Sequence, residues 1–104
     1  MIELKSARLL IYLVAANAID SEPSRLETSI AKVKANEVGH SVIDEALQIH
    51  GASGYMKELP LEYLYRWIRG WKIAGGTVEV QRNTIGGGVE KIRSRLIPLQ
   101  EILF

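Results

Sequence analysis

Several residue types that carry chemistry are scarce or absent in this chain. Its 104 residues include no cysteine, two histidines and three prolines. Without cysteine the protein can form no disulfide, thiolate nucleophile or cysteine-type zinc site. The histidines are not closely paired with carboxylates in the sequence, so we expect no metal site.

Long apolar runs are also missing. The stretch from Leu9 to Ala16 is far shorter than the roughly 20 residues needed to span a bilayer. Basic residues precede it and Ala16-Asn17-Ala18 imitates a signal-peptidase site, but Glu3 lies where a signal peptide should be basic. We therefore predict a cytoplasmic protein with no membrane association.

Composition predicts one folded domain whose charge is unevenly spread. Apolar residues make up 47% of the chain, which favours a packed core over disorder, and the length suits one modest domain. The net charge is +1, but residues 66–95 hold seven basic and two acidic residues, giving +5 there and −4 elsewhere. This positive region is either a solvated face or a site for an anionic cofactor or coenzyme A phosphates. No recognised motif supports nucleic-acid binding.

The first half of the chain predicts two helices. Residues 2–19 are apolar on almost every side, which is typical of a helix enclosed by partners. Pro23 follows that helix, and Ser24 and Glu27 have the spacing of a capping box that starts a second one. A stripe of mostly small apolar residues continues to Ile49, and Gly51 lies where a left-handed C-terminal cap belongs.

The second half predicts two further helices. Pro60 opens the third, Gly75-Gly76 ends it, and Thr77 is a suitable N-cap for the fourth, which continues to Leu96. Gly86-Gly87-Gly88 should weaken or break this last helix, because each interior glycine costs about 1 kcal/mol relative to alanine. The apolar tail after Pro98 should pack against other residues. No segment has strand periodicity, so we predict an all-α, antiparallel up-and-down bundle.

Three motifs in order resemble one known family. They are Gln48-Ile49-His50-Gly51-Ala52-Ser53-Gly54-Tyr55, then Leu59-Pro60-Leu61-Glu62 with Arg66, then Gly75-Gly76-Thr77-Val78-Glu79-Val80-Gln81-Arg82. The set resembles the C-terminal helical domain of the acyl-CoA dehydrogenases, flavoenzymes that oxidise the α,β carbons of acyl thioesters. The resemblance covers roughly residues 5–95. It implies that residues 1–104 form one such domain that lacks its first helix.

The resemblance implies two groups of FAD-binding residues. In the family, the loop matching Gln48, Gly51 and Gly54 contacts FAD that a neighbouring subunit mainly holds. Thr77 and Glu79 match a pair beside the adenosine half of the flavin. A simpler interpretation remains open for each group: a helix C-cap with a turn for the loop, and an N-cap with a first-turn acid for Thr77 and Glu79.

The chain departs from the family pattern where catalysis occurs. Many members carry their catalytic glutamate immediately before Gly-Thr, but this chain has Gly75 there. Other members supply the base from the preceding helix, which is missing here, so we assign no catalytic residue. Arg66 is commonly followed by aspartate in the family, whereas Trp67 follows it here.

Two functional hypotheses follow. In the first, the chain contributes FAD contacts and an oligomer interface to an acyl-CoA dehydrogenase-like enzyme, is inactive alone, and assembles with a separate chain that carries the remaining domains. In the second, it is a non-catalytic homo-oligomeric helical module without a cofactor. Both predict at least a homodimer, with residues 2–19 in the interface.

Overall fold

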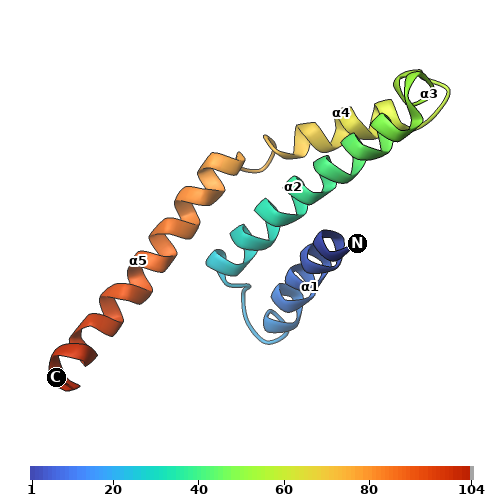
Figure 1. The fold of residues 1–104 in the computed structure, drawn as a ribbon. Coiled ribbons are helices and arrows are strands. Elements are labelled where there is room, and N and C mark those ends of the chain that lie inside the picture. The colour runs from blue at the N-terminus through green and yellow to red at the C-terminus, as the bar shows by residue number, and fades with distance from the viewer. Residues whose placement is uncertain (104) are drawn as a thin grey trace.

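Every regular element in the described part of the chain is a helix. The structure, a computed structural model, describes the backbone of residues 1–103 and the side chains of residues 1–97. The elements are α1 (Ile2–Asn17), α2 (Arg25–His50), α3 (Ala52–Tyr55), α4 (Leu61–Trp71) and α5 (Val78–Leu103) (Figure 1). The predicted all-α fold class is confirmed. The loop predicted after Gly51 differs in detail, because residues 52–55 form the single helical turn α3.

The turn between α1 and α2 is fixed by polar side chains at its two ends. The Ser24 hydroxyl accepts a hydrogen bond from the Glu27 backbone N–H at 3.4 Å, which is the first half of the predicted capping box. The Glu27 carboxylate accepts from Asn17 Nδ2, at 3.2 and 3.4 Å to its two oxygens. It therefore secures the end of α1 to the start of α2.

Helix α2 is the centre of the fold, and α1, α3, α4 and α5 all pack against it (Figure 1). The most buried apolar residues lie along these contacts: Ala7, Ala31, Val38, Ile68 and Val78. Close approach of α4 depends on Gly39, where an added Cβ would lie 2.9 Å from Ile68 Cδ1. The predicted stripe is therefore buried at Ala31 and Val38 but not at Ile49, which is exposed, and the close approach of α4 depends on Gly39, which lies outside that stripe.

Helix α5 is continuous, so the predicted break at the glycine triplet is wrong. None of these glycines has a positive φ. Gly88 packs against α2's first turn, where an added Cβ would lie 2.9 Å from Leu26 Cδ1. The α2–α5 contact offsets the low helix propensity of the triplet. The packing predicted for the tail after Pro98 lies outside the described side chains.

The chain as a whole is elongated, because the C-terminal part of α5 extends away from the other helices (Figure 1). Its dimensions are 64 × 27 × 25 Å and its radius of gyration is 18.3 Å. A compact domain of this length has a radius of gyration of about 13 Å. The antiparallel helices therefore form an open arrangement around α2, with large apolar side chains left on the surface.

Candidate functional site

The α4–α5 linker is held by one lysine. Lys32, on α2, places its ammonium nitrogen 2.6 Å from the carbonyl oxygens of both Ala74 and Gly75, and 2.8 Å from that of Gly76. Gly75 and Gly76 have φ values of +64° and +95°, which favour glycine. The converging carbonyls of this turn create a negative pocket that the Lys32 ammonium fills.

Two amides complete this clamp on the linker. Asn36 Nδ2, one helical turn after Lys32, donates to the Trp71 carbonyl at 2.8 Å. Gln81 Nε2 donates to the Gly75 carbonyl at 3.2 Å. Sequence reasoning missed Lys32 and Asn36. The sequence offered one signal for them: Lys32 and Asn36 are four residues apart, so both side chains lie on the same face of α2.

Thr77 starts α5 as its predicted N-cap. Its hydroxyl accepts a hydrogen bond from the Val80 N–H at 3.2 Å, and its carbonyl accepts from the Gln81 N–H at 2.9 Å. The Val78 N–H is also occupied, donating to the Lys72 carbonyl at 3.1 Å. Thr77 thus caps α5 and keeps its hydroxyl proton available as a donor. Glu79 lies in the first turn, where its charge complements the helix dipole.

A polar cavity of about 370 Å³ brings Thr77 and Glu79 together with basic side chains. Its lining side chains come from α2, α4, the linker and α5: Glu37, Arg69, Lys72, Ile73, Thr77, Val78, Glu79 and Arg82. Arg82 forms an ion pair with Glu37. Among the described side chains, Arg69 and Lys72 have no salt-bridge partner. The cavity therefore combines a hydroxyl, a carboxylate and two cations that are available to an anion.

The predicted loop lies at the opposite end of α4 from this cavity (Figure 1). Gly51 has φ +59° and ψ −136°, so its φ is positive as predicted but its ψ is outside the left-handed helical region. Its N–H donates to the Gln48 carbonyl at 3.1 Å, and the Gly54 N–H donates to the Gly51 carbonyl at 3.0 Å. The Gln48 side chain is exposed.

Gly54 is required by packing. It is buried, and an added Cβ would lie 2.9 Å from both the Leu47 carbonyl oxygen and His50 Cβ. At Gly51, by contrast, nothing lies within 4 Å of an added Cβ. Of the three predicted loop residues, Gln48 and Gly51 are therefore the two that are exposed to solvent. These residues are separated from Thr77 by the length of α4, about 16 Å for its 11 residues.

Comparison with known proteins decides the family. Residues 1–89 match the family described as "Acyl-CoA dehydrogenase, C-terminal domain". The chain belongs to the acyl-CoA dehydrogenase family. The resemblance drawn from the three motifs is therefore confirmed, together with the helical fold that it implied.

Curated relatives of this acyl-CoA dehydrogenase-family chain carry several names. It is 41% identical over 86 residues to "3-sulfinopropanoyl-CoA desulfinase" of Paraburkholderia xenovorans, which is 83% of this chain and 22% of that protein. It is 39% identical to "3-(aryl)acrylate reductase" of Clostridium sporogenes (86% of this chain, 24% of that protein). It is also 39% identical to "Short-chain specific acyl-CoA dehydrogenase, mitochondrial" of Bos taurus (85% and 21%). The chain thus spans less than a quarter of the length of these relatives.

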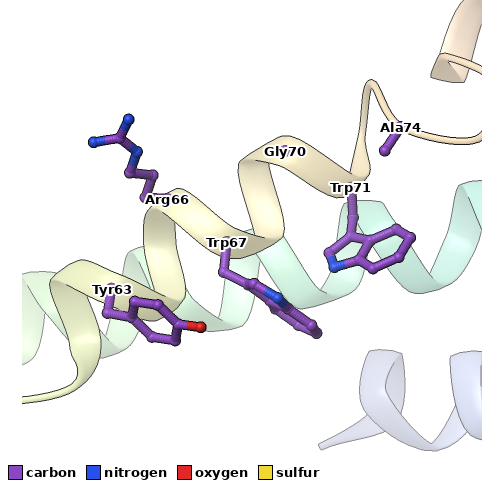
Figure 2. Close-up of a pocket in the computed structure, with 6 residues that line it drawn as sticks. All are labelled: Tyr63, Arg66, Trp67, Gly70, Trp71 and Ala74. Carbon is purple, nitrogen blue, oxygen red and sulfur yellow. The ribbon is translucent and has the colours of Figure 1, made fainter.

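The outer face of α4 carries the aromatic side chain of Trp67, which follows Arg66 in the sequence. Tyr63, Trp67 and Trp71 project to one side of α4, and Arg66 points away from them (Figure 2). These residues, with Gly70 and Ala74, line an apolar groove of about 450 Å³. The two indole rings are in edge contact, with centroids 5.8 Å apart and planes at 73°.

Within residues 1–103, none of the helices has the length and apolar character that a membrane span needs.

Proposed function

We propose that this chain serves as the C-terminal domain of an FAD-dependent acyl-CoA dehydrogenase-type oxidoreductase. In this role it contributes flavin contacts and a subunit interface, and the catalytic base comes from elsewhere. The observation that carries the proposal is the cavity at the start of α5, which joins Thr77 and Glu79 to Arg69 and Lys72. An acyl-CoA substrate and the remaining dehydrogenase domains are part of the same proposal.

The cavity suits the phosphate-bearing part of FAD better than the loop does. The two cations without salt-bridge partners attract an anion, and the Thr77 hydroxyl and Glu79 carboxylate can hydrogen-bond to sugar or base groups. When bound, FAD supplies a hydride acceptor for the β-carbon of the acyl thioester. The protein's own part is to position that cofactor.

The Gln48–Gly54 loop has fewer groups available for the same cofactor. The N–H groups of Gly51 and Gly54 are engaged within the chain, so contact falls to the Gln48 side chain and the open surface at Gly51. Since the loop and the cavity lie at opposite ends of α4, we propose that they serve different FAD molecules in an oligomer. The loop would reach the FAD held by a neighbouring subunit.

ADP titration tests the cavity directly. We expect millimolar ADP to shift the amide NMR signals of residues 69–82, and the shifts to disappear in the Arg69→Gln/Lys72→Gln double variant. Lys91→Gln with Arg93→Gln is the control, because it removes the same charge from the exposed part of α5. Shifts that persist in the cavity variant, or that follow net charge in both, would contradict the proposal.

Gly75 leaves this chain without a carboxylate at the family's catalytic position. We expect no turnover of an acyl-CoA panel in dye-reduction assays with the chain and added FAD, and weak or no retention of flavin by the chain alone. Activity of a complete enzyme requires a base from outside residues 1–104. Turnover above background, or a stoichiometric yellow protein from this chain alone, would refute this assignment.

Helix α1 supports the proposed subunit interface. Its buried residue is the small Ala7, whereas Leu9 and Leu13 are 66% and 49% exposed. A twofold contact between identical chains would cover them. Light scattering should show at least a dimer for the wild type and a smaller or aggregated species for Leu13→Glu. The control Val89→Glu places the same charge on α5, where Val89 is 54% exposed. A monodisperse wild-type monomer would contradict this part of the proposal.

A second candidate function is a homo-oligomeric helical module without a cofactor. The engaged N–H groups of Gly51 and Gly54 favour it, since they leave a structural turn at the place of a family FAD contact. A wild-type chain that dimerises in light scattering but shows no ADP-induced shifts in NMR would favour this alternative. The cytoplasmic location stays a prediction from the sequence.

A further inference from the structure

Helix α2 orients the α4–α5 linker through two of its side chains. Asn36 Nδ2 donates to the Trp71 carbonyl, and the Lys32 ammonium donates to the three carbonyls at the end of the linker. Between these contacts, the Lys72 carbonyl accepts from the Val78 N–H at 3.1 Å. Five backbone carbonyls of this short segment are therefore bonded, four of them to α2, and the path of the linker follows that helix.

The cavity at the start of α5 takes residues from both ends of this linker. Lys72 comes directly after Trp71, whose carbonyl Asn36 binds, and Thr77 comes directly after the last carbonyl that Lys32 binds. Lys72 and Thr77 both line the cavity, whereas Lys32 and Asn36 do not. The relative position of two cavity residues thus depends on two residues that lie outside the cavity.

The Lys32 side chain has no donor left for a ligand. An ammonium group carries three N–H donors, and three carbonyl oxygens lie 2.6–2.8 Å from the Lys32 nitrogen. Lys32 therefore acts on the backbone, and direct contact with an anion falls to Arg69, Lys72 and the Thr77 hydroxyl, which line the cavity.

Two glycines make the linker dependent on this clamp. Gly75 and Gly76 have φ values of +64° and +95°, and without a Cβ they could adopt many other conformations. Glycine loses more conformational freedom on being fixed than any other residue. In this chain the contacts with α2 fix the two glycines within the fold, so a ligand does not have to order them when it binds.

We propose that Lys32 and Asn36 are positioning residues for the nucleotide: by holding the linker, they set the separation of Lys72 and Thr77 in the cavity. This role rests on the proposed FAD site and adds to it two residues that lie outside the three sequence motifs. It predicts that the affinity of the cavity for a nucleotide depends on hydrogen bonds that no nucleotide touches.

Loss of either side chain should weaken nucleotide binding. A ligand that must order about one released linker residue is expected to bind about tenfold more weakly. Lys32→Met removes three hydrogen bonds and one charge, whereas Asn36→Leu removes one hydrogen bond and leaves the charge unchanged. A lower affinity in Asn36→Leu therefore cannot result from a weaker positive field.

ADP titration followed by amide NMR at low temperature tests this role. We expect Lys32→Met and Asn36→Leu to show the weaker binding. Lys91→Met and Asn83→Leu are the matched controls, because they make the same substitutions at exposed positions of α5, and both should bind ADP like the wild type. Circular dichroism shows that each variant is folded under the conditions of its titration. If Lys32→Met does not fold, Asn36→Leu decides the outcome.

Backbone dynamics provide a readout that a loss of stability alone would not change. Without ADP, the heteronuclear NOE of the Gly75 and Gly76 amides should be lower in the Lys32 and Asn36 variants than in the wild type. Saturating ADP should raise it again, because the ligand then orders the released linker. A variant that is only less stable would keep wild-type NOE values in its folded population.

Two results would overturn this role for Lys32 and Asn36. One is ADP binding of wild-type strength in both variants, and the other is linker glycines that stay as rigid as in the wild type. In either case the nucleotide site itself would stand. Absence of ADP-induced shifts in the wild type would instead refute the site and its positioning residues together, so the two failures are distinguishable.

Discussion

Removal of the Lys32 ammonium should destabilise the α4–α5 junction. Lys32→Met keeps most of the side-chain length and the apolar stem and removes the group that donates to the carbonyls of Ala74, Gly75 and Gly76. Hydrogen bonds from a charged donor contribute about 1.5–3 kcal/mol each in favourable settings. Here two of the three bonds are exposed, so water replaces much of what is lost.

The expected net loss follows from these opposing effects. At about 1 kcal/mol for each of the two exposed bonds and about 1.5–2 kcal/mol for the part-buried one, the three bonds contribute about 3.5–4 kcal/mol. Ordering the lysine side chain costs up to about 2 kcal/mol, which the variant recovers. The free energy of unfolding should therefore fall by about 2 kcal/mol. Because 1 kcal/mol shifts Tm by roughly 4–8 °C in a domain of this size, Tm should fall by about 8–16 °C.

Urea denaturation and native-state hydrogen exchange measure this effect. We expect lower global stability and faster exchange at Val78, Val80 and Gln81, whose N–H bonds depend on the linker geometry. Lys91→Met is the matched control on the exposed surface of α5 and should stay within about 0.5 kcal/mol of the wild type. Equal stability of Lys32→Met and Lys91→Met would refute the clamp.

Further predictions concern the glycine triplet and the α1–α2 ion pair. Gly86→Ala and Gly87→Ala should each stabilise the protein by about 0.5–1 kcal/mol, because nothing lies within 4 Å of their added Cβ atoms, whereas Gly88→Ala should lose about 1 kcal/mol against Leu26. Denaturation of the three variants checks this, and a uniform effect would contradict it. The Lys34 ammonium, by hydrogen bonding and charge, lowers the pKa of Glu3 in the fold. The pair's contribution is therefore present above the carboxyl's ordinary pKa and disappears as pH falls through the lowered one. The stability difference between wild type and Glu3→Gln should shrink in acid and in high salt, and a pH-independent difference would argue against the pair.

The boundaries of the helices could be predicted where they depend on local chemistry. Ser24 and Thr77 cap the helices that follow them, and Gly75-Gly76 adopts positive φ values between α4 and α5. These signals act within one turn of the chain, so the sequence displays them directly. The continuity of α5 could not be predicted, because the contact of Gly88 with Leu26 joins residues far apart in the sequence.

The sequence indicated those residues of the candidate site that belong to a local motif, but not those that packing brings together. The motif pointed to Thr77 and Glu79, and the local positive charge indicated either a solvated face or an anion site, but the sequence did not show that Arg69 and Lys72 line the same cavity. Lys32 was missed because its acceptors lie 42–44 residues away. Packing around α2 brings these residues together from distant parts of the chain, so no local sequence pattern predicts their contacts.

The linker clamp also bears on the missing catalytic carboxylate. Gly75 has φ +64°, a conformation that costs a non-glycine residue about 1–2 kcal/mol. A Cβ at this position would lie 3.2 Å from the Lys32 ammonium nitrogen. A glutamate introduced here would therefore be strained and would pair with Lys32, which lowers a carboxylate's pKa and weakens it as a base. The backbone and its clamp therefore both favour glycine over glutamate at position 75.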